Sequence, residues 1–216
     1  MLNVELFSEN KSPKILCLGA HSDDIEIGCG GTVLRLTRDL PDAQFRWVVF
    51  SGDAKRAKEA HQSANAFLKP IKSKVITVLD FKESYFPFIG ANIKDFFERT
   101  KTEFSPDLIF THCSNDAHQD HRLLSNLTWN TFRDHFILEY EILKFDGDLG
   151  SPNLYVNLDE ATVQEKVKII RDVFQSQKEK QWFDEDAFRS ILRLRGVESS
   201  SPSKHAEAFY CRKIVI

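Results

Sequence analysis

The segment that most constrains this chain is an apolar run, residues 15–19, which stops abruptly before His21, Asp23 and Asp24. A short apolar run of this kind is typical of a parallel strand that is covered on both faces. A glycine-rich segment follows at residues 28–31, and we expect it to turn the backbone tightly into a helix. The three polar residues are therefore predicted to lie at the carboxyl end of the strand, where open α/β sheets bind their ligands.

A second strand with the same layout lies further along the chain. Residues 108–111 form another apolar run, and the polar cluster behind it contains His112, His118, Asp120 and His121. Because the carboxyl ends of parallel strands meet at one edge of a sheet, the two clusters are expected to converge. Together they can supply three ligands to a divalent cation and leave one position for water, which predicts a hydrolytic site. Either segment alone is also explained by a capped turn or a solvated helix face.

The two clusters resemble the signature of a known enzyme family. The run Ala20-His-Ser-Asp-Asp24, taken with His118-Gln-Asp-His121, is similar to the A-H-P-D-D and H-x-D-H motifs of PIG-L/LmbE-like zinc-dependent N-acetyl-sugar deacetylases. The resemblance extends over most of the chain, through Thr111-His112, Asn115-Asp116, Arg195-Gly196 and residues 206–209. It implies a Rossmann-like fold, a bound zinc ion and an N-acylated amino sugar or sugar conjugate as the small-molecule substrate.

The resemblance also implies roles for individual residues. The zinc ligands would be His21, Asp24 and His121. Asp23 would be the general base, His118 the general acid and partner of the acyl oxygen, and Asp120 the residue that orients the His118 ring. One Zn²⁺ per chain follows from this set, although another divalent metal would also suit these ligands.

Three further features of the resemblance concern single positions. Arg56 lies where the family often has an arginine that contacts sugar hydroxyls, which implies a substrate contact. Ser22 replaces the usual proline, and we expect this to alter loop stiffness rather than chemistry, because proline there fixes a backbone angle and is no ligand. Many members have glutamate directly after the paired aspartates, whereas this chain has Ile25 and Glu26, and neither receives a role.

Alternating strand-like and helix-like segments run through the whole chain. This order favours an α/β fold with three layers, a Rossmann-like, doubly wound and mostly parallel sheet, in a single domain spanning residues 1–216. The predicted strands are residues 15–19, 45–50, 75–79, 108–111, 141–145, 155–158 and 209–215. The predicted helices are residues 32–39, 54–68, 93–104, 122–135, 160–174 and 184–195.

Bulk composition excludes several other classes of protein. The net charge is −3 and the hydrophobic content 42%, values that give no electrostatic case for a nucleic acid or an anionic membrane surface as partner. No basic segment leads into an apolar one at the N-terminus, which favours a cytoplasmic location. The four cysteines include no C-x-x-C pair, so no disulfide framework is predicted.

Several residues near the predicted site have two readings. His112 is best interpreted as a packing residue or a support for the metal ligands, and Glu207 matches a recurrent family position without a derivable role. The aromatic segment 85–88 either stacks on a sugar or anchors a loop. Residues 146–150 are expected to border the pocket.

The leading hypothesis is therefore a metal-dependent N-deacetylase acting on an amino sugar. Two alternatives stay open: a metal-dependent hydrolase of another amide or ester, and a non-catalytic Rossmann-like nucleotide-binding module. Residues 28–31 disfavour the module, because they lack the G-x-G-x-x-G spacing and follow two acids where a pyrophosphate would lie. Specificity in such folds resides in loops, so the sugar itself and a symmetric homo-oligomer both stay open.

Overall fold

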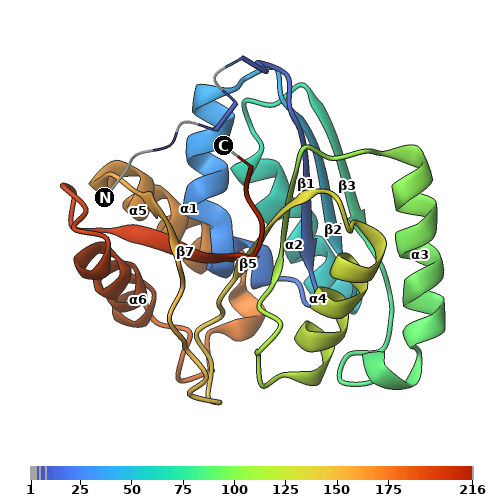
Figure 1. Ribbon diagram of the computed structural model, residues 1–216. Coiled ribbons are helices and arrows are strands. Elements are labelled where there is room, and N and C mark those ends of the chain that lie inside the picture. Colours follow the sequence, from blue (N-terminus) through green and yellow to red (C-terminus); the bar gives the residue numbers. More distant parts are fainter. Residues whose placement is uncertain (1–3, 5, 8, 216) are drawn as a thin grey trace.

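The computed structural model describes residues 4, 6–7 and 9–215. In this part of the chain, one seven-stranded sheet is surrounded by six α-helices and two short 3₁₀ helices (Figure 1). The elements are, in order, β1 (Lys14–Gly19), α1 (Asp24–Asp39), β2 (Gln44–Val49), α2 (Ala54–Phe67), β3 (Ser73–Val78), η1 (Phe86–Phe88), α3 (Gly90–Glu103), β4 (Leu108–His112), α4 (Gln119–Thr131), β5 (Phe136–Tyr140), β6 (Leu154–Asn157), α5 (Glu160–Val173), η2 (Gln175–Gln177), α6 (Glu185–Glu198) and β7 (Ala206–Cys211).

The strand order of the sheet is β3-β2-β1-β4-β5-β7-β6. Strands β1 to β5 pair in parallel, and β7 runs antiparallel to both β5 and β6. The chain first builds outward from β1 to β3 and then returns to place β4 on the other side of β1. The order therefore reverses between β1 and β4, the position at which doubly wound sheets bind ligands. The predicted mostly parallel, doubly wound α/β sheet is confirmed.

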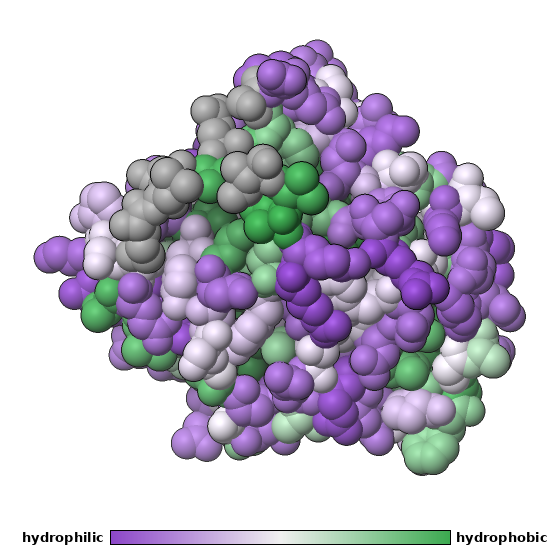
Figure 2. Space-filling model, viewed as in Figure 1, coloured by the Kyte–Doolittle hydropathy of each residue, from purple (hydrophilic) through white to green (hydrophobic). Residues whose placement is uncertain are grey.

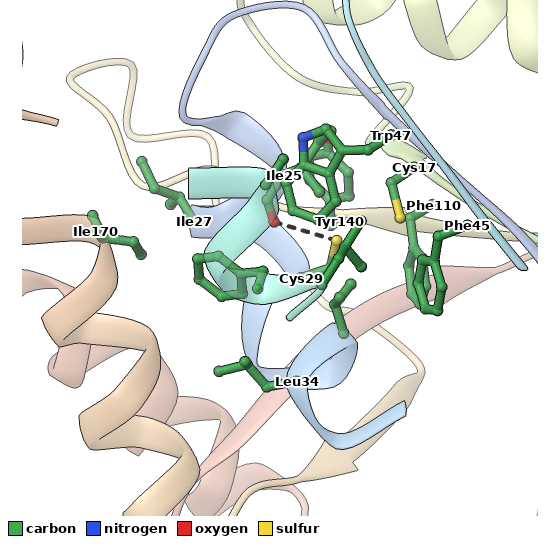
Figure 3. Packing of buried hydrophobic residues seen from close by; sticks show 14 of the residues in the cluster. Cys17, Ile25, Ile27, Cys29, Leu34, Phe45, Trp47, Phe110, Tyr140 and Ile170 are labelled. Carbon is green, nitrogen blue, oxygen red and sulfur yellow. Dashed lines mark hydrogen bonds between the residues drawn. The ribbon is translucent and has the colours of Figure 1, made fainter. Parts of the chain in front are cut away.

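Alternate residues of β1 face two different hydrophobic clusters. Ile15 and Cys17 point to the side covered by α1, α2, α5 and α6, whereas Leu16 and Leu18 point to the side covered by α3 and α4. Figure 3 shows part of the first cluster, in which α1 lies against side chains of the sheet. Since both faces of the strand are buried, its sequence is a continuous apolar run rather than an alternating one.

The glycine-rich segment does not form the turn that we expected. It lies inside α1, which begins at Asp24 and not at Thr32. A Cβ atom on Gly28 would stand 2.2 Å from the ring of Tyr140, and one on Gly31 would stand 2.4 Å from Leu158. Helix α1 therefore packs so closely against Tyr140 and Leu158 that a larger side chain would not fit at either position. This close packing explains why the helix contains these glycines.

A buried ion pair reaches the backbone of α1 beside Gly31. Lys166 of α5 and Glu207 of β7 lie 2.7 Å apart and are 2% and 3% exposed. The carboxylate of Glu207 accepts the N–H groups of Gly31 and Thr32 at 2.7 and 2.6 Å, and Lys166 donates to the carbonyl of Ile27 at 2.7 Å. In a regular α-helix that carbonyl accepts the N–H of Gly31. The ion pair thus supplies hydrogen-bond partners both to the N–H of Gly31 and to the carbonyl of Ile27.

Most predicted elements are present, but β7 spans Ala206–Cys211 and not residues 209–215, and the region around β5 was placed wrongly. Helix α4 ends at Thr131 and β5 spans Phe136–Tyr140, whereas the strand was predicted at residues 141–145. A short apolar run continues a helical pattern as well as it starts a strand, which explains the shift. Asp159 caps α5 as expected, by accepting the N–H of Thr162 at 2.7 Å. No helix within the described residues is both long and apolar enough to cross a membrane.

Candidate metal centre

The two polar clusters meet at the crevice between β1 and β4. The first follows β1 and continues into the first turn of α1, and the second joins β4 to α4. Hydrogen bonds pair β1 with β4 only as far as Cys17 and Phe110, although the strands continue to Gly19 and His112. The two strands therefore separate at their carboxyl ends, and the polar side chains occupy the space between them.

Three donor atoms form a nearly equilateral triangle in this crevice. Nδ1 of His21 lies 3.3 Å from Oδ2 of Asp24 and 3.1 Å from Nε2 of His121, and the last two atoms are 3.4 Å apart. Donors about 2.0–2.1 Å from a tetrahedral zinc ion are separated by roughly 3.3 Å. All three residues are buried. Two imidazoles and one carboxylate thus fit a divalent cation in both spacing and chemistry.

A carboxylate supports each of the two imidazoles from behind. Oδ2 of Asp116 lies 2.9 Å from Nδ1 of His121 and 3.1 Å from the ammonium group of Lys144. Oδ2 of Asp120 lies 3.4 Å from Nε2 of His21. Carboxylates in this position fix the tautomer and the orientation of a metal-binding imidazole. Both histidines therefore present one defined nitrogen to the centre of the triangle.

The expectation that Asp120 orients the ring of His118 is wrong. Its carboxylate accepts the backbone N–H groups of Ser84 and Phe86 at 2.6 and 3.1 Å, and its side-chain partner is His21. His118 is the N-cap of α4, and its Nδ1 accepts the backbone N–H of Asp120 at 3.3 Å. The first turn of α4 directs the carboxylate toward the loop before η1, away from the His118 ring.

Asp23 has one bound and one free oxygen. Its Oδ1 accepts a hydrogen bond from Arg56 at 3.0 Å, whereas its buried Oδ2 has no protein partner among the described residues. Burial raises the pKa of Asp23, and the guanidinium of Arg56 opposes this shift. Arg56 also contacts Glu83 at 3.1 Å, so it is held by two carboxylates and is not the freely solvated charge that its position on a helix suggests.

His118 lies beside the triangle. Its ring centroid is 4.9 Å from that of His21 and 4.6 Å from that of His121. Burial lowers the pKa of His118, and the adjacent His121 and His21 lower it further. Because Nδ1 accepts a backbone hydrogen bond, the neutral ring carries its proton on Nε2.

The charges at the three donors are strongly coupled. Burial opposes ionisation of Asp24, but the imidazoles of His121 and His21 outweigh it and hold the pKa of Asp24 well below its usual range. Burial also disfavours a charged His21, yet the Asp24 carboxylate prevails and raises the pKa of His21 to about 10. The same carboxylate raises the pKa of His121. A cation in the triangle takes the place of these protons, so metal binding at neutral pH is expected to release protons.

Besides His118, whose donor atom lies within 4.8 Å of those of His21 and His121, a second histidine near the triangle in the described part of the chain is His112. Its Nε2 is 3.3 Å from Oδ2 of Asp24, and the group Asp24, His112 and His121 also has donor atoms within 4.8 Å of one another. That nitrogen already accepts the backbone N–H of Ala20 at 3.0 Å. Burial lowers the pKa of His112 to about 4, which keeps the ring neutral. His112 is therefore a weaker candidate ligand than His21.

Sequence reasoning missed the role of Asp116, whereas it did point to the two loops that flank the site. Asp116 was noted in the resemblance but received no role, and its spacing of five residues before His121 is the signal that would have drawn attention to it. The loop before η1 bonds to Asp120, and Asp148 accepts the N–H of Ala117 at 2.7 Å, so residues 146–150 do border the site. Phe88, at the end of η1, is 77% exposed. Figure 2, viewed as Figure 1, shows apolar colour at the lower right edge, on the side of the molecule where α3 begins.

Comparison with known families gives one match. The PIG-L family model, described as GlcNAc-PI de-N-acetylase, matches residues 16–132, which is more than half of the chain and includes both polar clusters. No curated protein matches the chain significantly.

Solved structures share the fold over nearly the whole chain. The conserved protein TT1542 from Thermus thermophilus has a TM-score of 0.74 at 17% identity, covering 94% of this chain and 96% of its own. The N,N'-diacetylchitobiose deacetylase from Pyrococcus horikoshii has a TM-score of 0.64 at 20% identity, covering 95% and 85%. The 4-carboxy-2-hydroxymuconate hydratase from Pseudomonas putida has a TM-score of 0.69 at 14% identity, covering 94% and 98%. At these identities the likeness concerns the fold, which hosts more than one reaction.

Proposed function

Because the chain belongs to the PIG-L family of de-N-acetylases, we propose that it is a zinc-dependent hydrolase that removes an N-acetyl or similar acyl group from an amino sugar or sugar conjugate. The observation that carries this proposal is the triangle of His21, Asp24 and His121, whose edges of 3.1–3.4 Å suit a single cation. We further propose that residues 1–216 act as one catalytic domain.

The proposed reaction is hydrolysis of an amide, which is slow because neutral water is a weak nucleophile. A bound zinc ion supplies Lewis acidity, which polarises an acyl oxygen and lowers the pKa of water to about 7. Asp23 accepts the proton of the attacking water on Oδ2, which has no protein partner in the described part of the chain, while Arg56 holds Oδ1. The buried position of Asp23 favours this transfer, because a carboxylate removed from bulk water is a stronger base.

The second proton transfer is assigned to His118. In the collapsing intermediate the amine must leave in protonated form. His118 gives this proton as an imidazolium ion. The ring takes up a proton from solvent, its Nδ1 releases the backbone N–H of Asp120, the proton on Nε2 passes to the amine nitrogen, and Asp23 returns its own proton to solvent. The same N–H can donate a hydrogen bond to the acyl oxygen before the C–N bond breaks. Asp120 takes no part in the proton transfers and instead holds His21 and the loop before η1 in position.

A panel of N-acylated substrates tests the proposal. The purified protein is loaded with zinc and incubated with N-acetylglucosamine, an aryl glycoside of it and a sugar nucleotide, together with a non-sugar anilide and an ester. We expect release of acetate and of free amine from at least one sugar, loss of this activity with a chelator, and recovery with zinc. Cleavage of the anilide or ester alone would support the alternative hydrolase. Inactivity on every compound, with no bound metal, would support the non-catalytic module.

Replacement of Arg56 separates two roles for this residue. If Arg56 mainly holds Asp23, Arg56→Met is expected to lower kcat by about 10-fold to 100-fold, because a hydrogen bond to a charged group contributes roughly 1.5–3 kcal/mol, with little change in KM. If Arg56 instead contacts the sugar in the ground state and the transition state alike, KM rises and kcat stays unchanged. We expect the first result, because the guanidinium of Arg56 donates a hydrogen bond to Oδ1 of Asp23 at 3.0 Å.

Lys55→Met provides the matched control for this measurement. Lys55 is an exposed cation next to Arg56 in the first turn of α2, and its side chain has no role in the proposed chemistry. The variant Lys55→Met should leave kcat and KM unchanged. An equal effect of the two variants would point to the net charge of this face rather than to the contact with Asp23.

A further inference from the structure

His112 has no function in the proposed mechanism. It is fully buried at the end of β4, and it is neither an assigned zinc ligand nor an assigned acid or base. Its ring lies between the two halves of the proposed metal site. The question is why an imidazole occupies a position where an apolar side chain would avoid burying polar atoms.

The contacts of Nε2 answer part of this question. Beyond Cys17 and Phe110 the sheet no longer pairs β1 with β4. At this point Nε2 of His112 accepts the backbone N–H of Ala20 at 3.0 Å, across the gap between the strands. The hydroxyl of Tyr140 is 3.3 Å from the same nitrogen but donates to the carbonyl of Leu18 at 2.6 Å. The imidazole thus replaces a hydrogen bond that the sheet would otherwise have made.

Ala20 precedes His21, so its backbone position decides where this ligand lies. The carbonyl of Ala20 accepts a hydrogen bond from the Ser51 hydroxyl at 2.7 Å, on the side of β2. With His112 on the side of β4, the residue is held from both neighbouring strands. A backbone fixed on two sides cannot move sideways without losing a buried hydrogen bond.

The ring face of His112 meets the other half of the site. It stacks on His121 with a centroid distance of 3.9 Å and an interplanar angle of 17°. One side chain therefore contacts the backbone before His21 and the ring of His121, which come from opposite sides of the crevice. A shift of His112 would change the separation of the two ligands.

We propose that His112 is a positioning residue, whose Nε2 holds Ala20 across the strand gap and whose ring supports His121, and that it thereby sets the spacing of the metal ligands. This inference rests on the proposed metal site. It predicts the Nδ1–H tautomer of His112, because Nε2 is the acceptor. It also predicts that an acceptor at the position of Nε2 is required for tight metal binding.

Two variants whose side chains have similar length test whether an acceptor is needed at this position. In His112→Gln the amide oxygen can accept the N–H of Ala20, whereas in His112→Met the chain has similar size and no comparable acceptor. Zinc affinity of the metal-free proteins is measured by competition with a chromophoric chelator. We expect the Met variant to bind zinc about 10-fold to 100-fold more weakly than the Gln variant, as is typical when a supporting contact of a metal site is lost. Equal affinities in the two variants would overturn the proposal.

A measurement on the unaltered protein remains decisive if a variant fails to fold. In ¹⁵N-labelled metal-free protein, a scalar coupling across the hydrogen bond should connect the amide nitrogen of Ala20 with Nε2 of His112. Absence of this coupling together with an Nε2–H tautomer would overturn the inference. If the coupling is present but the protein binds no zinc, the proposed function fails while the contact itself stands.

Discussion

Asp23→Asn is expected to lower kcat by about 10²-fold to 10⁴-fold, the usual contribution of a general base, while one equivalent of zinc remains bound. The amide keeps the size of the side chain and can still meet Arg56 through its oxygen, but it cannot take up a proton at the position of Oδ2. That oxygen is buried and has no protein partner among the described residues. Steady-state kinetics on the substrate found in the panel, together with metal analysis of the same preparation, measures both quantities.

Asp24→Ala is the matched variant for this prediction. Asp24 contributes the carboxylate corner of the triangle, so its loss should abolish tight zinc binding and activity together. The two aspartates are adjacent in sequence, and a general effect of removing negative charge would act on both. If Asp23→Asn lost the metal and Asp24→Ala kept it, the roles of the two residues would have to be exchanged.

Lys166→Met is expected to lower the free energy of unfolding by about 3–5 kcal/mol, because it leaves the Glu207 carboxylate buried without its cation. Native domains are stable by only about 5–15 kcal/mol, so much of the stability of the protein would be lost. Glu207 is 3% exposed and cannot turn to water. Urea denaturation of the metal-free protein measures this change without interference from metal binding.

Two controls isolate the ion pair. Lys168→Met makes the same substitution two residues away in α5, where the ion pair with Asp172 is exposed, and should change stability by no more than about 0.5 kcal/mol. The double variant Lys166→Met/Glu207→Met should be more stable than Lys166→Met, because the freed carbonyl of Ile27 can again accept the N–H of Gly31. A double variant as unstable as the sum of its two single variants would contradict this account.

Much of the candidate site was visible in the chain itself. The residue types, their position directly after apolar runs and the family resemblance together identified His21, Asp24 and His121, and the structure brings these three side chains together. The direction in which Asp120 points was not predictable. The two oxygens of the Asp120 carboxylate accept the backbone N–H groups of Ser84 and Phe86. These residues belong to a loop that is distant in sequence, and only folding brings them within reach.

The glycines of α1 show the same division. A glycine cluster after a strand is compatible with a turn or with a helix that packs closely, and the sequence alone favoured the turn. The ring of Tyr140 lies more than a hundred residues away along the chain, and it is this ring that excludes a side chain at Gly28. Likewise, neither Lys166 nor Glu207 carries a local signal that they meet beside Gly31.

The sequence by itself determined the class of fold, the existence of two strand ends that carry candidate metal ligands and the chemical types of their side chains, because each depends on patterns within a few residues of the chain. Only the tertiary structure decided which groups touch: Asp120 with His21, Arg56 with Asp23, and His112 with Ala20. The physical reason is that hydrogen bonds act over about 3 Å. Partners brought together by the crossing of helices and strands must be located to within a fraction of that distance, and local patterns do not contain this information.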